Sequence, residues 1–251
     1  MSKLLKKILI VTSIITIVIV AALVLSFAAL SMKLKSEIAH FTPLETGKVV
    51  DDIFVVKDDF ANLFIVQDGV QYVVFDGANN PSSVAKEMEK LGIDLDAVAA
   101  VFLTHTDGDH VGAIGLFEKA KLYISKEEEP MINGTKFRKF VFCNSLPRTD
   151  YILLENHQTV QIGNLKIEGI LVPGHTPGAM AYLINDKYLF TGDIVSLKDG
   201  KIAPAPEFFN MNHAQAIKSL DDIFRNISNA EYIFTAHWGY TDDFKAAVNN
   251  D

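Results

Sequence analysis

The chain has 251 residues, 49% of them hydrophobic and 22% charged, and carries a formal net charge of −8 at pH 7. Residues 1–40 contain five Lys and one Glu, so residues 41–251 carry a net charge of −12. This acidic body argues against a nucleic-acid partner, because phosphate binding requires a basic face. The single cysteine, Cys143, excludes an internal disulfide and a cysteine-rich metal site, and its apolar neighbours predict a small buried side chain.

The first apolar segment is long enough to cross a membrane. Residues 8–30 are 23 consecutive positions without a charge. As a helix they would extend roughly 35 Å, against about 30 Å for the hydrocarbon core of a bilayer. Lys3, Lys6 and Lys7 precede the segment and favour a cytoplasmic location for residues 1–7. We therefore expect a single-pass anchor, with the rest of the chain outside the cytoplasm. The alternative is a long signal peptide, which would make the protein secreted.

After the anchor we expect a polar linker over residues 31–46 and one domain over residues 47–251. The domain begins with three apolar runs within residues 52–78, separated by "KDD" and "QDG". Short apolar, β-branched and aromatic runs between turn residues are typical of strands, so these residues predict a meander.

Helix signals follow the meander. Asn80 is a suitable N-cap, Pro81 fits the first helical position and Gly92 fits the end of the helix. Farther along, Ser125 and Glu128 have the spacing of a capping box, in which each side chain satisfies a backbone amide at a helix start.

The remaining elements alternate between strands and helices. We expect strands over residues 98–103, 151–154, 165–172, 181–184, 188–190 and 232–236, a helix over residues 212–227 and a short final helix. Mixed strands with interspersed helices favour an α/β domain in which two packed sheets are covered by helices on the outside.

Four segments rich in metal-binding side chains each follow an apolar strand: "FLTHTDGDH", "LVPGHTPG", "YLFTGD" and "IFTAHWG". They contain four imidazoles and three carboxylates: His105, Asp107, Asp109, His110, His175, Asp193 and His237. Any one of these residues alone would more often be a turn former or a loop hydrogen bonder. Four occurrences at strand ends indicate a common site. Seven ligands are too many for one tetrahedral ion and suit two ions that share a bridge.

The combined pattern resembles the metallo-β-lactamase superfamily, whose first motif is His-x-His-x-Asp-His, and is most similar to its glyoxalase II-like branch. The resemblance covers about residue 47 to the C-terminus and implies an αββα sandwich with the site along one edge of the sheets. It also implies two divalent ions, most often zinc, with iron or manganese as alternatives. The implied ligands are His105, Asp107 and His175 for the first ion, Asp109, His110 and His237 for the second, and Asp193 for both.

Asp107 departs from the family pattern, which has histidine at this position. Aspartate has a shorter side chain, so it requires a closer backbone or a bridging water to reach the metal. Its negative charge should make a bound hydroxide harder to form, and its oxygen favours iron or manganese. One ion, or none, is therefore an alternative to two.

The resemblance implies a hydrolase of an ester, thioester or lactone that attacks a small-molecule substrate with a metal-bridging hydroxide. Asp109 would accept the proton, and Tyr240 would donate a hydrogen bond to the developing oxyanion. The chain ends 14 residues after His237, so we expect no glutathione-recognition domain. A non-hydrolytic metal-binding or sensing domain and an iron-dependent oxidoreductase of the same fold are alternatives. Residues 198–212 are expected to form a lid, with an apolar wall made by Phe208, Phe209 and Met211.

Overall fold

The computed structural model describes residues 2–138, 144–227 and 229–248, and the chain divides into two units, Met1–Phe41 and Thr42–Asp251. The prediction for Cys143 lies outside the described residues. The first unit contains one helix, α1 (Lys3–Ile38), whose N-terminus is capped by the Ser2 hydroxyl. The helix continues past the apolar stretch because residues 31–38 contain neither Gly nor Pro, so half of the expected linker is helical.

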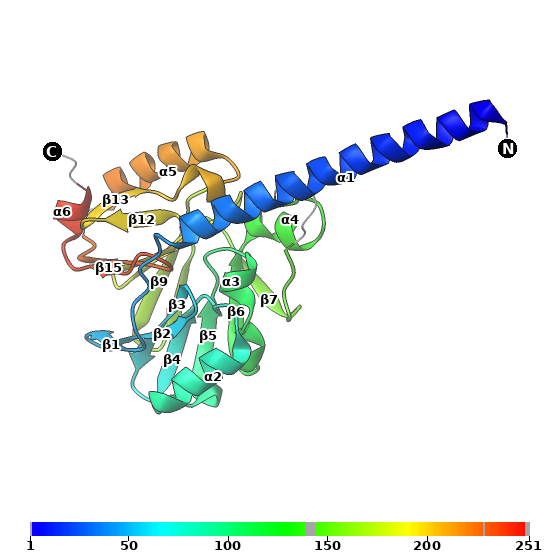
Figure 1. The fold of residues 1–251 in the computed structure, drawn as a ribbon. Coiled ribbons are helices and arrows are strands. Elements are labelled where there is room, and N and C mark those ends of the chain that lie inside the picture. The colour runs from blue at the N-terminus through cyan, green and yellow to red at the C-terminus, as the bar shows by residue number, and fades with distance from the viewer. Residues whose placement is uncertain (1, 139–143, 228, 249–251) are drawn as a thin grey trace. The chain divides into compact units, whose positions relative to one another are not determined.

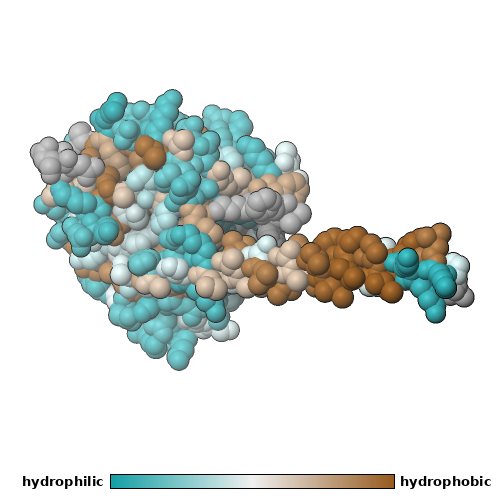
Figure 2. Space-filling model, turned by 45° about the horizontal axis from the view of Figure 1, so that its top comes forward, coloured by the Kyte–Doolittle hydropathy of each residue, from teal (hydrophilic) through white to brown (hydrophobic). Residues whose placement is uncertain are grey.

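Helix α1 has the length and composition of a membrane-spanning helix. None of its residues is buried, and Figure 2 shows a broad band of apolar surface along it, next to a hydrophilic N-terminal end. A signal sequence near the N-terminus would have the same properties.

The second unit contains two large sheets and one hairpin. The seven strands of the first sheet follow chain order: β1 (Gly47–Val50), β2 (Ile53–Asp58), β3 (Ala61–Asp68), β4 (Gln71–Phe75), β5 (Val98–Phe102), β6 (Lys121–Ser125) and β7 (Tyr151–Leu154). Strands β1 to β4 pair with one another in antiparallel fashion, and β4 to β7 pair in parallel. The parallel strands therefore end at the same edge of the sheet.

The second sheet has six strands in the order β15-β14-β11-β10-β9-β8. Their bounds are β8 (Thr159–Ile162), β9 (Leu165–Leu171), β10 (Met180–Ile184), β11 (Tyr188–Gly192), β14 (Tyr232–Thr235) and β15 (Tyr240–Thr241). Strands β11 and β14 are parallel, so their C-terminal ends also lie at one edge. The separate hairpin consists of β12 (Val195–Lys198) and β13 (Lys201–Pro204).

Three apolar layers hold the second unit together. The layer between the two sheets contains stacked rings such as Phe75 and Phe190, whose centroids lie 4.4 Å apart. Helix α2 (Pro81–Lys90) covers the outer face of the first sheet with Val84 and Met88. The outer face of the second sheet is covered by α5 (His213–Asn226) and α6 (Phe244–Val248). Figure 1 shows α2 and α5 on opposite sides of the two sheets, which is the expected αββα sandwich.

Most of the expected elements are confirmed. The meander is β2 to β4, and Asn80 caps α2 by accepting hydrogen bonds from the amides of Ser82 and Ser83. The predicted capping box at Ser125 and Glu128 is wrong. Ser125 instead accepts a hydrogen bond from the Glu127 amide, and the Glu128 side chain is buried in the interior. Strands β1, β6, β8 and β15 and the β12–β13 hairpin were not expected. Strands β1, β8 and β13 have mixed polarity and contain only half-buried or exposed side chains. Strand β6, in contrast, is buried after its first residue.

Candidate metal centre

The loops that carry the candidate ligands leave the sheets at neighbouring strand ends. Helix α3 (Gly108–Val111) begins shortly after β5 and carries Asp109 and His110. His175 follows β9, and Asp193 follows β11 directly. His237 comes two residues after β14. The strands of the two sheets fix these starting points, while the loop backbones are free to turn the side chains inward.

One group of possible ligands is formed by Asp109, His110 and His237, whose ligand atoms lie within 4.8 Å of one another. Asp109 Oδ2 lies 3.4 Å from His237 Nε2 and 3.9 Å from His110 Nε2. Both imidazoles are buried, whereas the Asp109 side chain is 24% exposed. The group is therefore open to solvent through Asp109.

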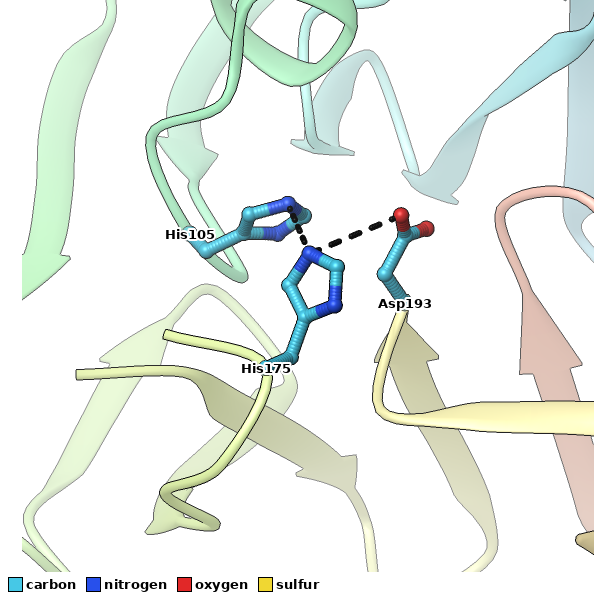
Figure 3. Close-up of side chains that lie close together, drawn as sticks. All are labelled: His105, His175 and Asp193. Atoms are coloured by element: carbon cyan, nitrogen blue, oxygen red, sulfur yellow. Dashed lines mark hydrogen bonds and ion pairs between the residues drawn. The ribbon is translucent and has the colours of Figure 1, made fainter. Parts of the chain in front are cut away.

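A second group is formed by His105, His175 and Asp193 (Figure 3), whose ligand atoms also lie within 4.8 Å of one another. Nε2 of His105 and Nε2 of His175 lie 3.1 Å apart, and Asp193 Oδ2 lies 3.7 Å from His175 Nε2. Two ligands of a zinc ion at about 2.0–2.1 Å lie roughly 3.3 Å apart in a tetrahedral site, so these separations match a metal site.

Asp193 lies between the two groups. Its Oδ1 atom is 3.0 Å from His237 Nε2 and 3.3 Å from His110 Nε2, while Oδ2 faces His175. One carboxylate therefore faces imidazoles of both groups with different oxygens. This is the arrangement that a bridging ligand requires.

Hydrogen bonds to Nδ1 fix the orientation of three imidazoles. His110 Nδ1 lies 3.0 Å from Asp76 Oδ2, and His237 Nδ1 donates to the Phe60 carbonyl at 2.7 Å. His105 Nδ1 lies 3.1 Å from the Thr104 hydroxyl, which donates to Asp76. Because Nδ1 carries the proton in each neutral ring, the Nε2 lone pairs face the centre, as metal ligation requires.

Two buried atoms of the centre indicate that it can hold a metal ion. Among the described residues, His110 Nε2 and Asp193 Oδ1 are buried and have no hydrogen-bond partner, although they lie 3.3 Å apart. Buried polar atoms normally have a partner, and a cation between the two atoms would provide one for both once His110 has lost its Nε2 proton. Imidazoles and carboxylates are the donors that zinc, iron and manganese bind. The residues present therefore fit a divalent metal ion.

Asp107 has different partners from the other six candidates. Its Oδ2 atom lies 3.3 Å from His175 Nε2 and 3.5 Å from His105 Nε2, but also 2.9 Å from Nη2 of Arg138. Asn144 donates to its other oxygen at 2.9 Å. The structure thus brings Asp107 to the expected place, where it forms an ion pair with an arginine.

A buried carboxylate, Glu128, joins two of the ligand loops. It accepts hydrogen bonds from the amide and hydroxyl of Thr106 at 2.9 and 2.8 Å, from the Thr176 hydroxyl at 2.6 Å and from the Gly178 amide at 3.1 Å. Thr106 lies between His105 and Asp107, and Thr176 follows His175. Glu128 therefore fixes the positions of both loops.

The electrostatics of the centre reflect its carboxylates. Burial disfavours the charged form of each imidazole, but at two of them the neighbouring carboxylates together outweigh burial. Asp193 and Asp109 raise the pKa of His237 to about 10, and Asp193, Asp76 and Asp109 raise the pKa of His110 well above its usual value. At His175, burial and the charge of Arg138 lower the pKa to about 4. A metal ion would have to displace protons from His110 and His237.

Tyr240 lies apart from the ligand interactions. Its side chain is exposed and stacks on Phe234 with ring centroids 5.7 Å apart. In the part of the chain that the structure describes, Tyr240 has no hydrogen bond or ion pair with a candidate ligand. Its expected catalytic role therefore stays a prediction.

Sequence reasoning missed Asp76, Glu128, Arg138 and Asn144. Asp76 had a usable signal, because it directly follows β4 in the way that Asp193 follows β11. The other three have no such signal, since their partners are 22 to 71 positions away in the chain.

Comparison with known proteins relates the chain to a family of metallohydrolases. The sequence profile of the metallo-beta-lactamase superfamily matches residues 56–237. A probable polyketide biosynthesis zinc-dependent hydrolase, PksB of Bacillus subtilis, is 36% identical over 137 residues, which cover 53% of this chain and 54% of PksB. The chain thus spans about half the length of this relative.

Two further matches are more distant. A hydroxyacylglutathione hydrolase of Dictyostelium discoideum is 24% identical over 197 residues, which cover 75% of this chain and 65% of that protein. Among solved structures, a B3 metallo-beta-lactamase with an active-site glutamic acid superposes with a TM-score of 0.62 at 18% identity. That match covers 84% of this chain and 86% of the other, and it shows a common fold.

Proposed function

This chain belongs to the metallo-beta-lactamase superfamily, and we propose that it is a zinc-dependent hydrolase of an ester, thioester or lactone. The match over residues 56–237 includes all seven candidate ligands, and the similar proteins include zinc-dependent hydrolases. Among the three substrate classes we favour thioesters, because several relatives are named for hydrolysis of hydroxyacylglutathione, which is a thioester.

The position of Asp193 carries the proposal. Its carboxylate faces His110 and His237 with one oxygen and His175 with the other, which supports two adjoining ions with a shared ligand. Bound divalent ions lower the pKa of a water molecule to near neutrality and polarise the carbonyl group of a substrate. We assign Zn²⁺ to both sites, because imidazoles form most of the ligand set.

Asp109 is the proposed proton acceptor. It is the most exposed of the three candidate carboxylate ligands, so it can reach a substrate or a water molecule. Burial raises its pKa, but the charge of His110 and the hydrogen bond to His237 outweigh burial and keep the pKa below its usual value. The carboxylate is therefore ionised at neutral pH and can accept a proton. Tyr240 is the proposed donor to the developing oxyanion.

We also propose that α1 anchors the enzyme in a membrane, with residues 1–7 in the cytoplasm and the hydrolase unit outside. The apolar surface of α1 and the lysines before it support this orientation. Protease treatment of intact cells tests it. Digestion of the hydrolase unit from the outside is expected, whereas digestion only after lysis would place the unit inside.

The hydrolytic activity is tested with the full chain in detergent, loaded with zinc. We expect thiol release from an acyl thioester, loss of that activity after chelation and its return with added zinc. Ester, lactone, phosphodiester and cephalosporin substrates are measured in parallel, so that the substrate class is identified by its rate. A zinc-loaded chain that hydrolyses none of these compounds would contradict the proposal.

A further inference from the structure

The guanidinium of Arg138 contacts two atoms that the first ion would use. Its Nη2 atom lies 2.9 Å from Asp107 Oδ2 and 3.1 Å from His175 Nε2. Arginine can only donate hydrogen bonds, so a hydrogen bond with His175 Nε2 uses the lone pair that would otherwise bind a metal. The same positive charge lies against the Asp107 oxygen that would otherwise face the ion.

Arg138 is held in this position by the protein backbone. Its side chain is only 15% exposed, and it donates to the carbonyls of His175 and Phe209, each at 2.5 Å. The side-chain amide of Asn144 donates a hydrogen bond to the second oxygen of Asp107. Both oxygens of Asp107 therefore have protein donors, and the arginine is too constrained to move away without breaking several contacts.

The group at His110 and His237 has more carboxylates around its imidazoles. Among the described residues, these two imidazoles form ion pairs with Asp76, Asp109 and Asp193, whereas His105 and His175 form ion pairs with Asp107 and Asp193 and have Arg138 beside them. A divalent cation is stabilised by these negative charges, whereas Arg138 repels it at His105 and His175. The two metal sites of one chain should therefore differ in affinity.

We propose that Arg138 competes with the first metal ion for Asp107 and His175, so that the second site, at Asp109, His110 and His237, fills first and more tightly. This inference rests on the proposed function only in requiring that the chain binds metal. The pair of Arg138 and Asp107 thus makes the ion at the first site a reversible ligand of the enzyme, with its occupancy set by the available concentration of zinc.

The unmodified protein provides the first test. Zinc titration of the chelator-treated full chain, against a chelating indicator, should give two dissociation constants that differ by about tenfold or more. Cobalt titration adds a spectroscopic measurement, because the first equivalent should give one set of d–d bands and the second equivalent another. Two equal constants with a single set of bands would overturn the proposal.

Arg138→Gln provides the second test. Removal of the positive charge should tighten the weaker constant by about tenfold or more and leave the tighter one nearly unchanged. Arg138→Lys retains the charge and should keep the weaker constant within a few-fold of the wild-type value. Lys136→Gln removes a charge from an exposed side chain two positions away and serves as the matched control.

Weaker zinc binding by Arg138→Gln would show that Arg138 supports the first site. If Arg138 instead orients Asp107 as a ligand, Arg138→Gln should weaken the first site by about 10- to 100-fold, the usual cost of losing an outer-shell partner. That outcome would overturn the competition. Because zinc affinity is measured without a substrate, a chain that hydrolyses nothing but binds zinc with two separate constants would refute the proposed activity alone.

Discussion

The Glu128 carboxylate accepts a hydrogen bond of 2.6 Å from the Thr176 hydroxyl, 48 positions away in the chain. The same carboxylate accepts from Thr106, so one buried side chain connects the loop of His105 with the loop of His175. Burial raises the pKa of Glu128, while the charge of His105 and these hydrogen bonds oppose the rise. The positions of the imidazoles at the first site therefore depend on a residue that is not one of the candidate ligands.

Glu128→Gln should destabilise the fold by about 1–3 kcal/mol, because an amide NH₂ would then face the backbone amide of Thr106 or Gly178. Urea unfolding of the zinc-loaded chain measures the change. The exposed neighbour provides a control, since Glu127→Gln should stay within about 0.5 kcal/mol of the wild type. Equal stabilities for the two variants would contradict the structural role of Glu128.

Asp76→Asn should weaken zinc binding at the second site by about 10- to 100-fold, because the carboxylate that holds the proton on His110 Nδ1 is lost. Asn also tolerates the positive φ of 64° at this position, so the backbone should be preserved. A competition titration with a zinc indicator measures the affinity. Asp59→Asn is the matched control, since Asp59 has a φ of 51° and an exposed side chain. Equal affinities in the two variants would refute the orienting role.

The stability of the chelator-treated chain should fall as the pH rises. Burial lowers the pKa of His237, but Asp193 and Asp109 outweigh burial and raise it to about 10, so the folded state holds a proton that the unfolded state releases near pH 6.5. The stabilisation is complete below about pH 6.5 and is lost as the pH rises through about 10. Urea unfolding across this range measures the loss. The zinc-loaded chain should lack this decline, because the metal replaces the proton; identical profiles would contradict the prediction.

Asp107→His alone should not produce a second tight zinc site, although it introduces the imidazole that is usual in the family. The substitution leaves the charge of Arg138 unpaired next to His175, where it still opposes a cation. Combined with Arg138→Gln, the same substitution should tighten the first site by about tenfold or more. Zinc titrations of the single and double variants measure the difference. Tight binding of two ions by the single variant would show that Arg138 has no effect on the first site.

The ligand loops could be predicted from the sequence because their positions depend on local patterns. "FLTHTDGDH" and "YLFTGD" both show an apolar run that ends in polar side chains, and parallel strands bring such ends to one edge. The cap of α2 is equally local, since Asn80 bonds residues two and three positions away. These features required no knowledge of distant contacts.

The residues that surround the candidate ligands could not be predicted, because their partners lie far away in the sequence. Ser125 and Glu128 have the spacing of a capping box, yet Glu128 is turned inward by donors from Thr106 and Gly178. Arg138 belongs to no recognisable motif, and its partner Asp107 lies 31 positions earlier. Helix α1 also extends beyond the apolar segment at residues 8–30. Hydropathy predicts which residues can lie in a membrane, but it does not predict where the helix ends.

Zinc retention by Asp193→Ala tests the central claim most directly, because the Asp193 carboxylate faces imidazoles of both groups. The wild-type and variant chains are loaded with zinc, dialysed and assayed for bound metal, with circular dichroism to verify the fold. Asp222→Ala, which alters an exposed carboxylate on α5, is the control. We predict that wild type and control retain zinc and that folded Asp193→Ala retains none. A folded Asp193→Ala chain with the wild-type zinc content would contradict the shared-ligand account.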